Sequence, residues 1–192
     1  MAYEQPRYTV VEREKNLEVR RYEPYIVAEI DARGSLEEAG NKAFRPLADF
    51  IFGKNRRSEK MAMTVPVTQA PKGETVGMTA PVMQSSSGEQ TYVVSFVMPS
   101  RYTMTTLPQP IDPSIRFREV PASTVVAWSY RGTWSASRYE KEERAFREAV
   151  AKRGWTMSGA LVWARYNPPF WPWFLRRNEI LGELSAAKPA ER

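Results

Sequence analysis

The chain has 192 residues, and its 42% hydrophobic content, 26% charged content and net charge of +6 are those of a folded globular domain. It contains neither cysteine nor histidine, which excludes disulfides, thiolate metal sites and cysteine nucleophiles and removes the commonest catalytic base. Charges of both signs are interspersed, so nothing indicates nucleic-acid binding. The longest charge-free aromatic run, 167–175, is too short to span a bilayer, and the first residues lack the apolar core of an export signal. We therefore expect no integral membrane segment and a cytoplasmic location.

Apolar and polar residues alternate along three stretches near the start of the chain, which predicts three strands. These strands are expected over 8–13, 17–22 and 25–32. Lys15-Asn16, between the first two, predicts a hairpin.

A helix is predicted after the third strand, because Ser35 and Glu38 form a capping box. Its apolar positions recur at helical spacing and define one buried face: Leu36, Ala39, Ala43, Phe44, Leu47 and Ile51. Pro46 predicts a bend within it, and Gly53 ends it.

The same order recurs in the second half of the chain. A strand over 124–130 is followed by Arg131-Gly132, by a second capping box at Ser137-Arg-Tyr-Glu140 and by a helix that ends at Gly154. The expected buried face of that helix consists of Tyr139, Phe146, Ala149 and Val150. Because the two units lie about a hundred residues apart, we predict an α+β fold of two pseudo-repeated halves, about 8–98 and 115–184. Two such halves would form one curved antiparallel sheet, or a distorted β-barrel, flanked by two α-helices.

A smaller repeat lies between the halves. Met63–Gln69 is echoed by Met78–Gln84, and each is predicted as a short strand with proline at an edge or bulge. The clearest strand follows over 90–98, and after a proline-punctuated excursion the chain returns to the sheet over 115–120.

The segment 161–180 combines a strand, a stiff proline-rich turn and a paired Arg176-Arg177. Its aromatic side chains are Tyr166, Phe170, Trp171, Trp173 and Phe174. One interpretation is a platform for a flat, partly anionic ligand, and the other is that these rings close one end of the barrel and that Arg177 pairs with nearby Glu179.

Nothing in the sequence specifies a catalyst. The helical carboxylates lie among Lys and Arg as on a solvated face, and neither a phosphate-binding loop nor a Gly-x-Ser-x-Gly turn is present. We therefore expect no enzyme, no catalytic residues and no metal site.

Several motifs together resemble the SOUL haem-binding protein family, relatives of the animal cytosolic haem-binding protein. They are Val19–Glu29, Lys60–Val67 with its echo Met78–Val82, Tyr92–Pro99 with Leu107-Pro, Tyr166-Asn-Pro-Pro, and Leu175–Ile180. The resemblance runs from about Tyr8 to Leu184 and implies a single domain over 1–184, with 185–192 as a flexible tail.

The resemblance implies non-covalent binding of haem or another tetrapyrrole in a shallow apolar groove beside the first helix. Met61, Met63 and Val65 would line this groove, Phe50, Ile51, Tyr166 and Trp171 would add apolar walls, and Arg176 or Arg177 would meet the propionates. Histidine ligation of iron is impossible here, and aromatic residues stand where animal relatives carry a lysine in the late loop. The expected role is haem buffering, transport or sensing by a monomer.

Two other functions stay open. The duplicated fold is similar to the effector-binding modules of multidrug-responsive regulators and of gyrase-inhibitor-like proteins, which suggests a small-molecule sensor or a protein inhibitor. An enzyme acting on tetrapyrroles, with Tyr166 or a groove carboxylate as the acid, is a third hypothesis that no residue requires.

Overall fold

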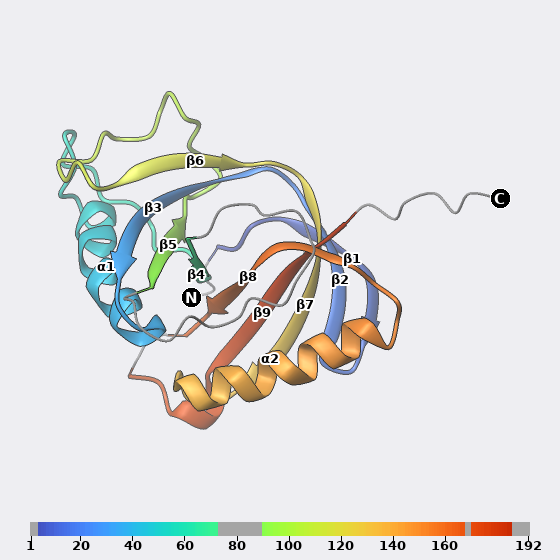
Figure 1. Cartoon of the computed structure of the whole chain (residues 1–192). Helices are drawn as coiled ribbons and strands as arrows, with labels where there is room; N and C mark the ends of the chain where they lie inside the picture. The colour runs from blue at the N-terminus through green and yellow to red at the C-terminus, as the bar shows by residue number, and fades with distance from the viewer. Residues whose placement is uncertain (1–3, 73–89, 168–169, 186–192) are drawn as a thin grey trace.

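The fold is taken from a computed structural model, which describes residues 4–72, 90–167 and 170–185. Its elements in chain order are β1 (Tyr8–Glu14), β2 (Leu17–Tyr22), β3 (Tyr25–Arg33), α1 (Leu36–Ile51), β4 (Val67–Pro71), β5 (Thr91–Val97), β6 (Arg116–Val120), β7 (Ser123–Arg131), α2 (Ala136–Ala151), β8 (Met157–Arg165), the 3₁₀ turn η1 (Trp173–Leu175) and β9 (Arg177–Leu184). Within the described residues, the nine strands form one antiparallel sheet in the order β1-β2-β7-β9-β8-β4-β5-β3-β6 (Figure 1). The sheet curves without closing, since β1 and β6 lie at its edges. The predicted α+β fold with two flanking helices is confirmed.

The strand order shows the predicted duplication. The sheet reads β6-β3-β5-β4 from one edge and β2-β7-β9-β8 from the other side, so that β4 and β8 meet at its centre. The first half supplies β2, β3, α1, β4 and β5, and the second half supplies β6, β7, α2, β8 and β9. The first strand of each half pairs with a strand of the other half, β2 with β7 and β6 with β3. The strand β1 is additional, because it extends the edge beside β2. The domain limits of 1–184 stay a prediction, and nearly all of the predicted tail lies outside the described residues.

Both helices cover the same face of the sheet (Figure 1). A row of directly paired, mostly apolar residues crosses this face from β3 to β2: Ile30, Val94, Gln69, Trp163, Ile180, Trp128 and Leu17. On it α1 buries Ala43, Leu47 and Ile51, while α2 buries Phe146 and Val150. The strand residues directly before and after each member of this row point to the opposite face. Neither α1 nor α2 covers that face, which is called the helix-free face below.

The first helix begins as predicted, and the second does not. The Ser35 hydroxyl accepts a hydrogen bond from the Glu38 amide (3.3 Å), and the Glu38 carboxylate accepts one from the Ser35 amide (2.9 Å). The helix continues through Pro46 to Ile51. The prediction of a second capping box at Ser137 is wrong. The helix α2 begins at Ala136, and the side chain of Ser135 before it makes no capping hydrogen bond. Hydroxyl contacts of Ser135 to Thr133 and Ser137, at 3.2 and 3.4 Å, take the place of a cap.

The methionine repeat is only partly a strand. The predicted strand Met63–Gln69 is displaced toward the C-terminus, because β4 begins at Val67 and leaves Met63 and Val65 in the irregular segment before it. The Val65–Pro66 peptide bond is cis, and proline has no amide to donate to a neighbouring strand. The second copy, 78–84, lies outside the described residues.

Candidate functional site

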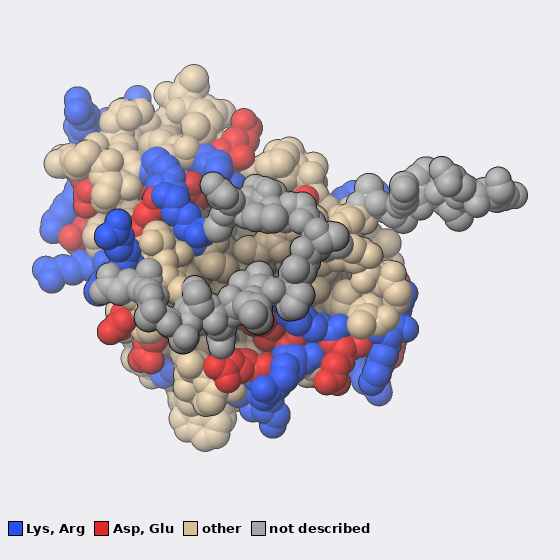
Figure 2. Space-filling model, in the orientation of Figure 1, with Lys and Arg blue, Asp and Glu red and all other residues tan. Residues whose placement is uncertain are grey.

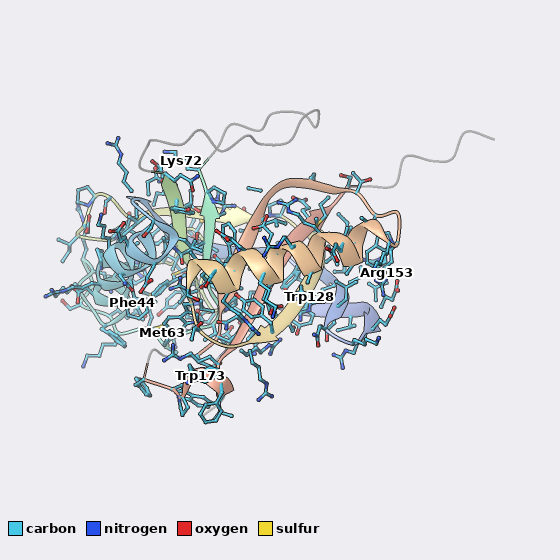
Figure 3. All side chains as sticks on the ribbon, turned by 60° about the horizontal axis from the view of Figure 1, so that its bottom comes forward. Phe44, Met63, Lys72, Trp128, Arg153 and Trp173 are labelled. Carbon is cyan, nitrogen blue, oxygen red and sulfur yellow. The ribbon has the colours of Figure 1, made fainter. Side chains whose placement is uncertain are left out.

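The predicted site residues lie in three different places: the core under α1, a buried ionic network on the helix-free face, and the exposed loop before β9. Figure 3 shows Phe44, Met63 and Trp173 along one side of the molecule.

The first group lies beneath the surface. Phe50, Ile51 and Met61 are 1%, 0% and 4% exposed and belong to the core cluster between α1 and the sheet. Phe50 packs against the Phe117 ring with a centroid separation of 5.6 Å. In this arrangement these three residues support the surface from below, and their contact with a ligand stays a prediction.

The surface above this core is apolar. Phe44 is 40% exposed and packs edge-on against Phe96 at 5.3 Å. Met63 is half-buried and packs on the same core cluster, while Val65 is also half-buried. Phe44, which the sequence assigned to the buried face of the helix, is therefore part of the accessible surface here, together with Met63.

The second group forms a buried ionic network around Glu179. The Arg20 guanidinium donates to both Glu179 carboxylate oxygens at 2.7 and 2.8 Å, and neither side chain is exposed. Arg177 and Tyr166 donate to the same carboxylate at 2.6 Å each, and Ser129 donates at 2.9 Å. The pairing of Arg177 with Glu179 that the sequence suggested is therefore present.

This network determines the protonation of its members. Burial alone would raise the pKa of Glu179, but the hydrogen bonds and charge of Arg20, the charge of Arg177 and the Tyr166 hydroxyl outweigh it and lower the pKa to about 2. Burial raises the pKa of Tyr166 well above its ordinary value. Tyr166 is only 7% exposed, and its hydroxyl is hydrogen-bonded to Glu179. The side chain is therefore unsuited to act as a proton donor or as an iron ligand.

A corresponding ion pair lies in the other half of the sheet. Arg118 and Arg116 donate to the buried Glu29 carboxylate at 3.0 and 2.9 Å. Arg20 is paired with Val125, the third residue of β7, and Arg118 with Val27, the third residue of β3. The two arginines thus occupy equivalent positions of the two halves, and each neutralises a carboxylate on the helix-free face.

The third group is built around Trp134, which sequence reasoning missed. The guanidinium groups of Arg176 and Arg165 lie 4.6 and 4.8 Å from its ring centroid. Arg176 also donates to the Trp171 carbonyl at 2.8 Å, and Trp171 is 43% exposed. The structure therefore brings Arg176 and Trp171 of the late loop together, as expected. Trp134, which lies far from both in the sequence, completes the cluster.

Arg165 connects this loop to the first helix. A Cβ added at Gly40 of α1 would lie 3.2 Å from Arg165 Nη1 and 2.9 Å from the side-chain oxygen Oε1 of Gln69. Arg165 Nε donates to the Tyr139 hydroxyl at 3.0 Å. Arg165 Nη2 and the neighbouring Trp163 Nε1 are buried without a hydrogen-bond partner in the part of the chain that the structure describes. Buried donors of this kind usually bind water or a polar ligand. In the sequence, only Arg165 itself, the last residue of β8, could have indicated this junction.

A cavity of about 550 Å³ lies elsewhere, between the N-terminal segment, the start of β3 and the loop after β5. Its apolar and aromatic wall includes Tyr25, Met98 and Tyr102, and its acidic lining includes Glu23 and Glu119. None of the predicted site residues lines it, so the sequence missed this cavity.

Neither a metal centre nor a membrane helix is seen in the described ranges. No three His, Cys, Asp or Glu side chains within 4–72, 90–167 and 170–185 are grouped to hold a metal ion. Neither helix described there is long and apolar enough to cross a bilayer.

A family profile described as SOUL heme-binding protein matches residues 3–183. The chain belongs to the SOUL haem-binding family. This match confirms the resemblance drawn from the motifs. No curated protein matches the sequence.

Solved structures share the fold of this SOUL protein at low identity. An uncharacterized conserved protein from Listeria innocua has a TM-score of 0.65 at 10% identity, with 88% of this chain and 92% of that chain covered. A structure described as a hydrolase from Listeria innocua has a TM-score of 0.63 at 9% identity, with coverages of 91% and 94%. The EcmrR C-terminal domain has a TM-score of 0.62 at 10% identity, with coverages of 93% and 98%. At such identities the likeness shows the fold alone.

Proposed function

We propose that this SOUL protein binds haem or a related tetrapyrrole non-covalently and without catalysis, in a role of haem buffering, transport or sensing. The observation that carries the proposal is the family match across residues 3–183. It is supported by the absence of any histidine or cysteine and by the engagement of two candidate acids elsewhere, since Glu179 is paired with Arg20 and the Tyr166 hydroxyl donates to Glu179.

The proposed binding surface runs from Phe44 and Met63 to Trp171 and Arg176. Phe44 and Met63 supply a polarizable apolar face for the macrocycle. Trp171 adds an exposed ring, and the Arg176 guanidinium beside Trp134 supplies positive charge for a propionate. Phe50, Ile51 and Met61 would support this surface from beneath, and Arg177 would serve chiefly to neutralise Glu179.

The residues fit the porphyrin ring better than they fit its iron. With no histidine or cysteine in the chain, and with Tyr166 buried against Glu179, the Met63 thioether is the one soft atom of the proposed surface. Iron would add little to affinity, so burial of the apolar ring dominates binding.

Titration of the protein with hemin and with iron-free protoporphyrin, followed by the Soret band and tryptophan quenching, tests the proposal. We expect saturable binding of both at micromolar concentration with similar affinity. Met63→Ala combined with Arg176→Ala should weaken it at least about tenfold, through lost apolar contact and lost charge.

Met104→Ala with Arg147→Ala is the matched control, because both residues are exposed and lie away from the proposed surface. Unsaturable binding, or equal affinities of the two double variants, would show that this surface does not bind tetrapyrroles.

The cavity of about 550 Å³ favours a second candidate, binding of a small aromatic cation as an effector. Tyr25 and Tyr102 offer ring faces there, and Glu23 and Glu119 offer negative charge. A neighbour of similar fold, SAV2435, was solved bound to tetraphenylphosphonium, at 9% identity, a TM-score of 0.50 and coverages of 89% and 94%.

Titration calorimetry with tetraphenylphosphonium separates the two candidates. Binding that Glu119→Gln weakens while hemin affinity is unchanged would support a separate effector site. No heat of binding at millimolar ligand would remove this candidate.

A further inference from the structure

The loop before β9 exposes an unusual concentration of apolar side chains. In the described part of the chain, five of the eleven large hydrophobic residues with exposed side chains fall within six consecutive positions. These five residues, here named the aromatic tip, are Phe170 (82% exposed), Trp171 (43%), Trp173 (58%), Phe174 (55%) and Leu175 (43%). Isolated exposed hydrophobic residues need no explanation, but such a cluster usually marks a contact surface.

The backbone and the rings of the tip make contacts within the loop itself. Pro172 precedes the single turn η1, in which the Leu175 amide donates to the Pro172 carbonyl at 3.0 Å. The rings of Trp173 and Phe174 pack at right angles, 5.7 Å apart. A rigid apolar loop loses little conformational entropy on insertion, so its exposed area contributes more fully to binding.

The tip also projects from the body of the protein. Figure 3 shows Trp173 at the margin of the molecule, beyond α2. At the place that η1 occupies in Figure 1, Figure 2 shows an uncharged projection, with acidic and basic side chains on the body of the protein behind it. No Asp or Glu occurs between Asn167 and Asn178.

Arginines gather behind the tip. Arg176 and Arg177 follow it directly, and Arg131 lies opposite Arg177 in the β7–β9 pair. Arg138 donates to the Arg131 carbonyl at 2.8 Å. Arg138 and Arg177 pair with Glu142 and Glu179, and in each pair the arginine side chain is the exposed one, 35% against 11% and 42% against 0%, so these pairs present their positive member to the solvent.

We propose that the aromatic tip inserts into the interface of an anionic lipid bilayer, with Arg131 and Arg176 contacting its acidic headgroups. Tryptophan and phenylalanine beside arginine are the residues that favour the boundary between headgroups and acyl chains. A narrow projecting loop is too small for a standard protein interface of about 800 Å² per partner, whereas a fluid bilayer needs no complementary shape. The net charge of +6 adds long-range attraction to such a surface. This inference concerns the ligand-free protein and does not depend on tetrapyrrole binding.

Co-sedimentation of hemin-free protein with phosphatidylcholine vesicles, with and without phosphatidylglycerol, tests the inference. We expect sedimentation with the anionic vesicles that weakens as salt is raised, because the arginine contribution is screened. Trp173→Ala with Phe174→Ala should lower the partition coefficient at least about tenfold. Arg131→Ala should reduce the preference for phosphatidylglycerol.

Val11→Ala with Ile111→Ala is the matched control, since these side chains are 57% and 64% exposed and lie outside the tip. On the unaltered protein, lipids brominated near the headgroup should quench tryptophan fluorescence, a readout that needs no variant to fold. Absence of sedimentation with anionic vesicles, or equal partitioning of tip and control variants, overturns the inference. So does a wild-type dimer that the tip variant converts to monomer, because the tip would then bind a second copy of the chain.

Discussion

The replacement Glu179→Gln tests the buried ionic network most directly. Glutamine keeps the size of the side chain, so the change removes charge without leaving a cavity. The Arg20 guanidinium, which is 0% exposed, then loses its carboxylate partner on β9 and retains the Glu18 carboxylate at 2.7 Å and the Tyr22 hydroxyl at 3.2 Å. A buried charge deprived of its partner destabilises a protein by about 3–5 kcal/mol. Because Glu18 still pairs with Arg20, we expect a loss near about 3 kcal/mol at neutral pH.

The pKa of Glu179 leads to the same magnitude. Its displacement from the ordinary value of 4.5 to about 2 in the folded protein corresponds to about 3 kcal/mol of stability. Because the folded-state pKa is the lower one, this stability is fully present above pH 4.5 and is lost as the pH falls toward 2. The difference between wild type and Glu179→Gln should therefore be constant near neutrality and shrink through that acidic window.

Urea unfolding followed by circular dichroism, repeated from neutral pH to about pH 3, measures both quantities. Arg147→Ala is the control, because its pair with Glu143 is largely exposed and should contribute less than about 0.5 kcal/mol. A Glu179→Gln loss no larger than that of Arg147→Ala would refute the reasoning. A difference that does not depend on pH would also refute it.

Two further changes test the packing and capping of the helices. Phe146→Ala empties a fully buried position under α2 and should lower the free energy of unfolding by about 3–5 kcal/mol. Phe52→Ala is the control, because this side chain is 57% exposed and its loss should change the free energy of unfolding little. Urea unfolding of both variants measures the difference. Ser35→Ala removes the capping box of α1 and should cost about 1 kcal/mol in a thermal melt. Ser135→Ala should destabilise the protein clearly less than Ser35→Ala, since the Ser135 side chain makes no capping hydrogen bond. Equal losses of stability would show that the two helices do not differ in their N-terminal capping.

The repeat was readable from the sequence because its signals are local. Arg33-Gly34 and Arg131-Gly132, each followed closely by serine, mark the places where a strand ends and a helix follows, and alternation of apolar residues marks the strands. The start of β4 was not readable, because Pro66 has no amide to donate to a neighbouring strand, and Thr64 before it forms an isolated bridge with Glu4, which no local pattern predicts. The start of α2 was misplaced for a related reason, since several hydroxyl residues near Ser137 compete for the position of the cap.

The candidate site was less predictable than the fold. Phe50, Ile51 and Met61 have the same apolar character whether they line a groove or fill a core, and only their burial shows that they belong to the core. The rings of the late loop were expected to divide between scaffold and site, yet five of its six residues from 170 to 175 have exposed side chains. Trp134 was missed because its two arginine partners, Arg165 and Arg176, are more than thirty positions away in the sequence.

The sequence by itself determined the family, the α+β class, the duplicated order of elements and the exclusion of histidine and cysteine chemistry, because composition, periodicity and motifs reside in the linear chain. Only the tertiary structure decided the sheet order, the exchange of the first strands between halves and the partners of the charged residues. Arg20 and Glu179 are 159 positions apart, yet they form a buried pair because β2 and β9 both lie beside β7. Burial and pairing depend on such long-range neighbours, and no local pattern encodes them.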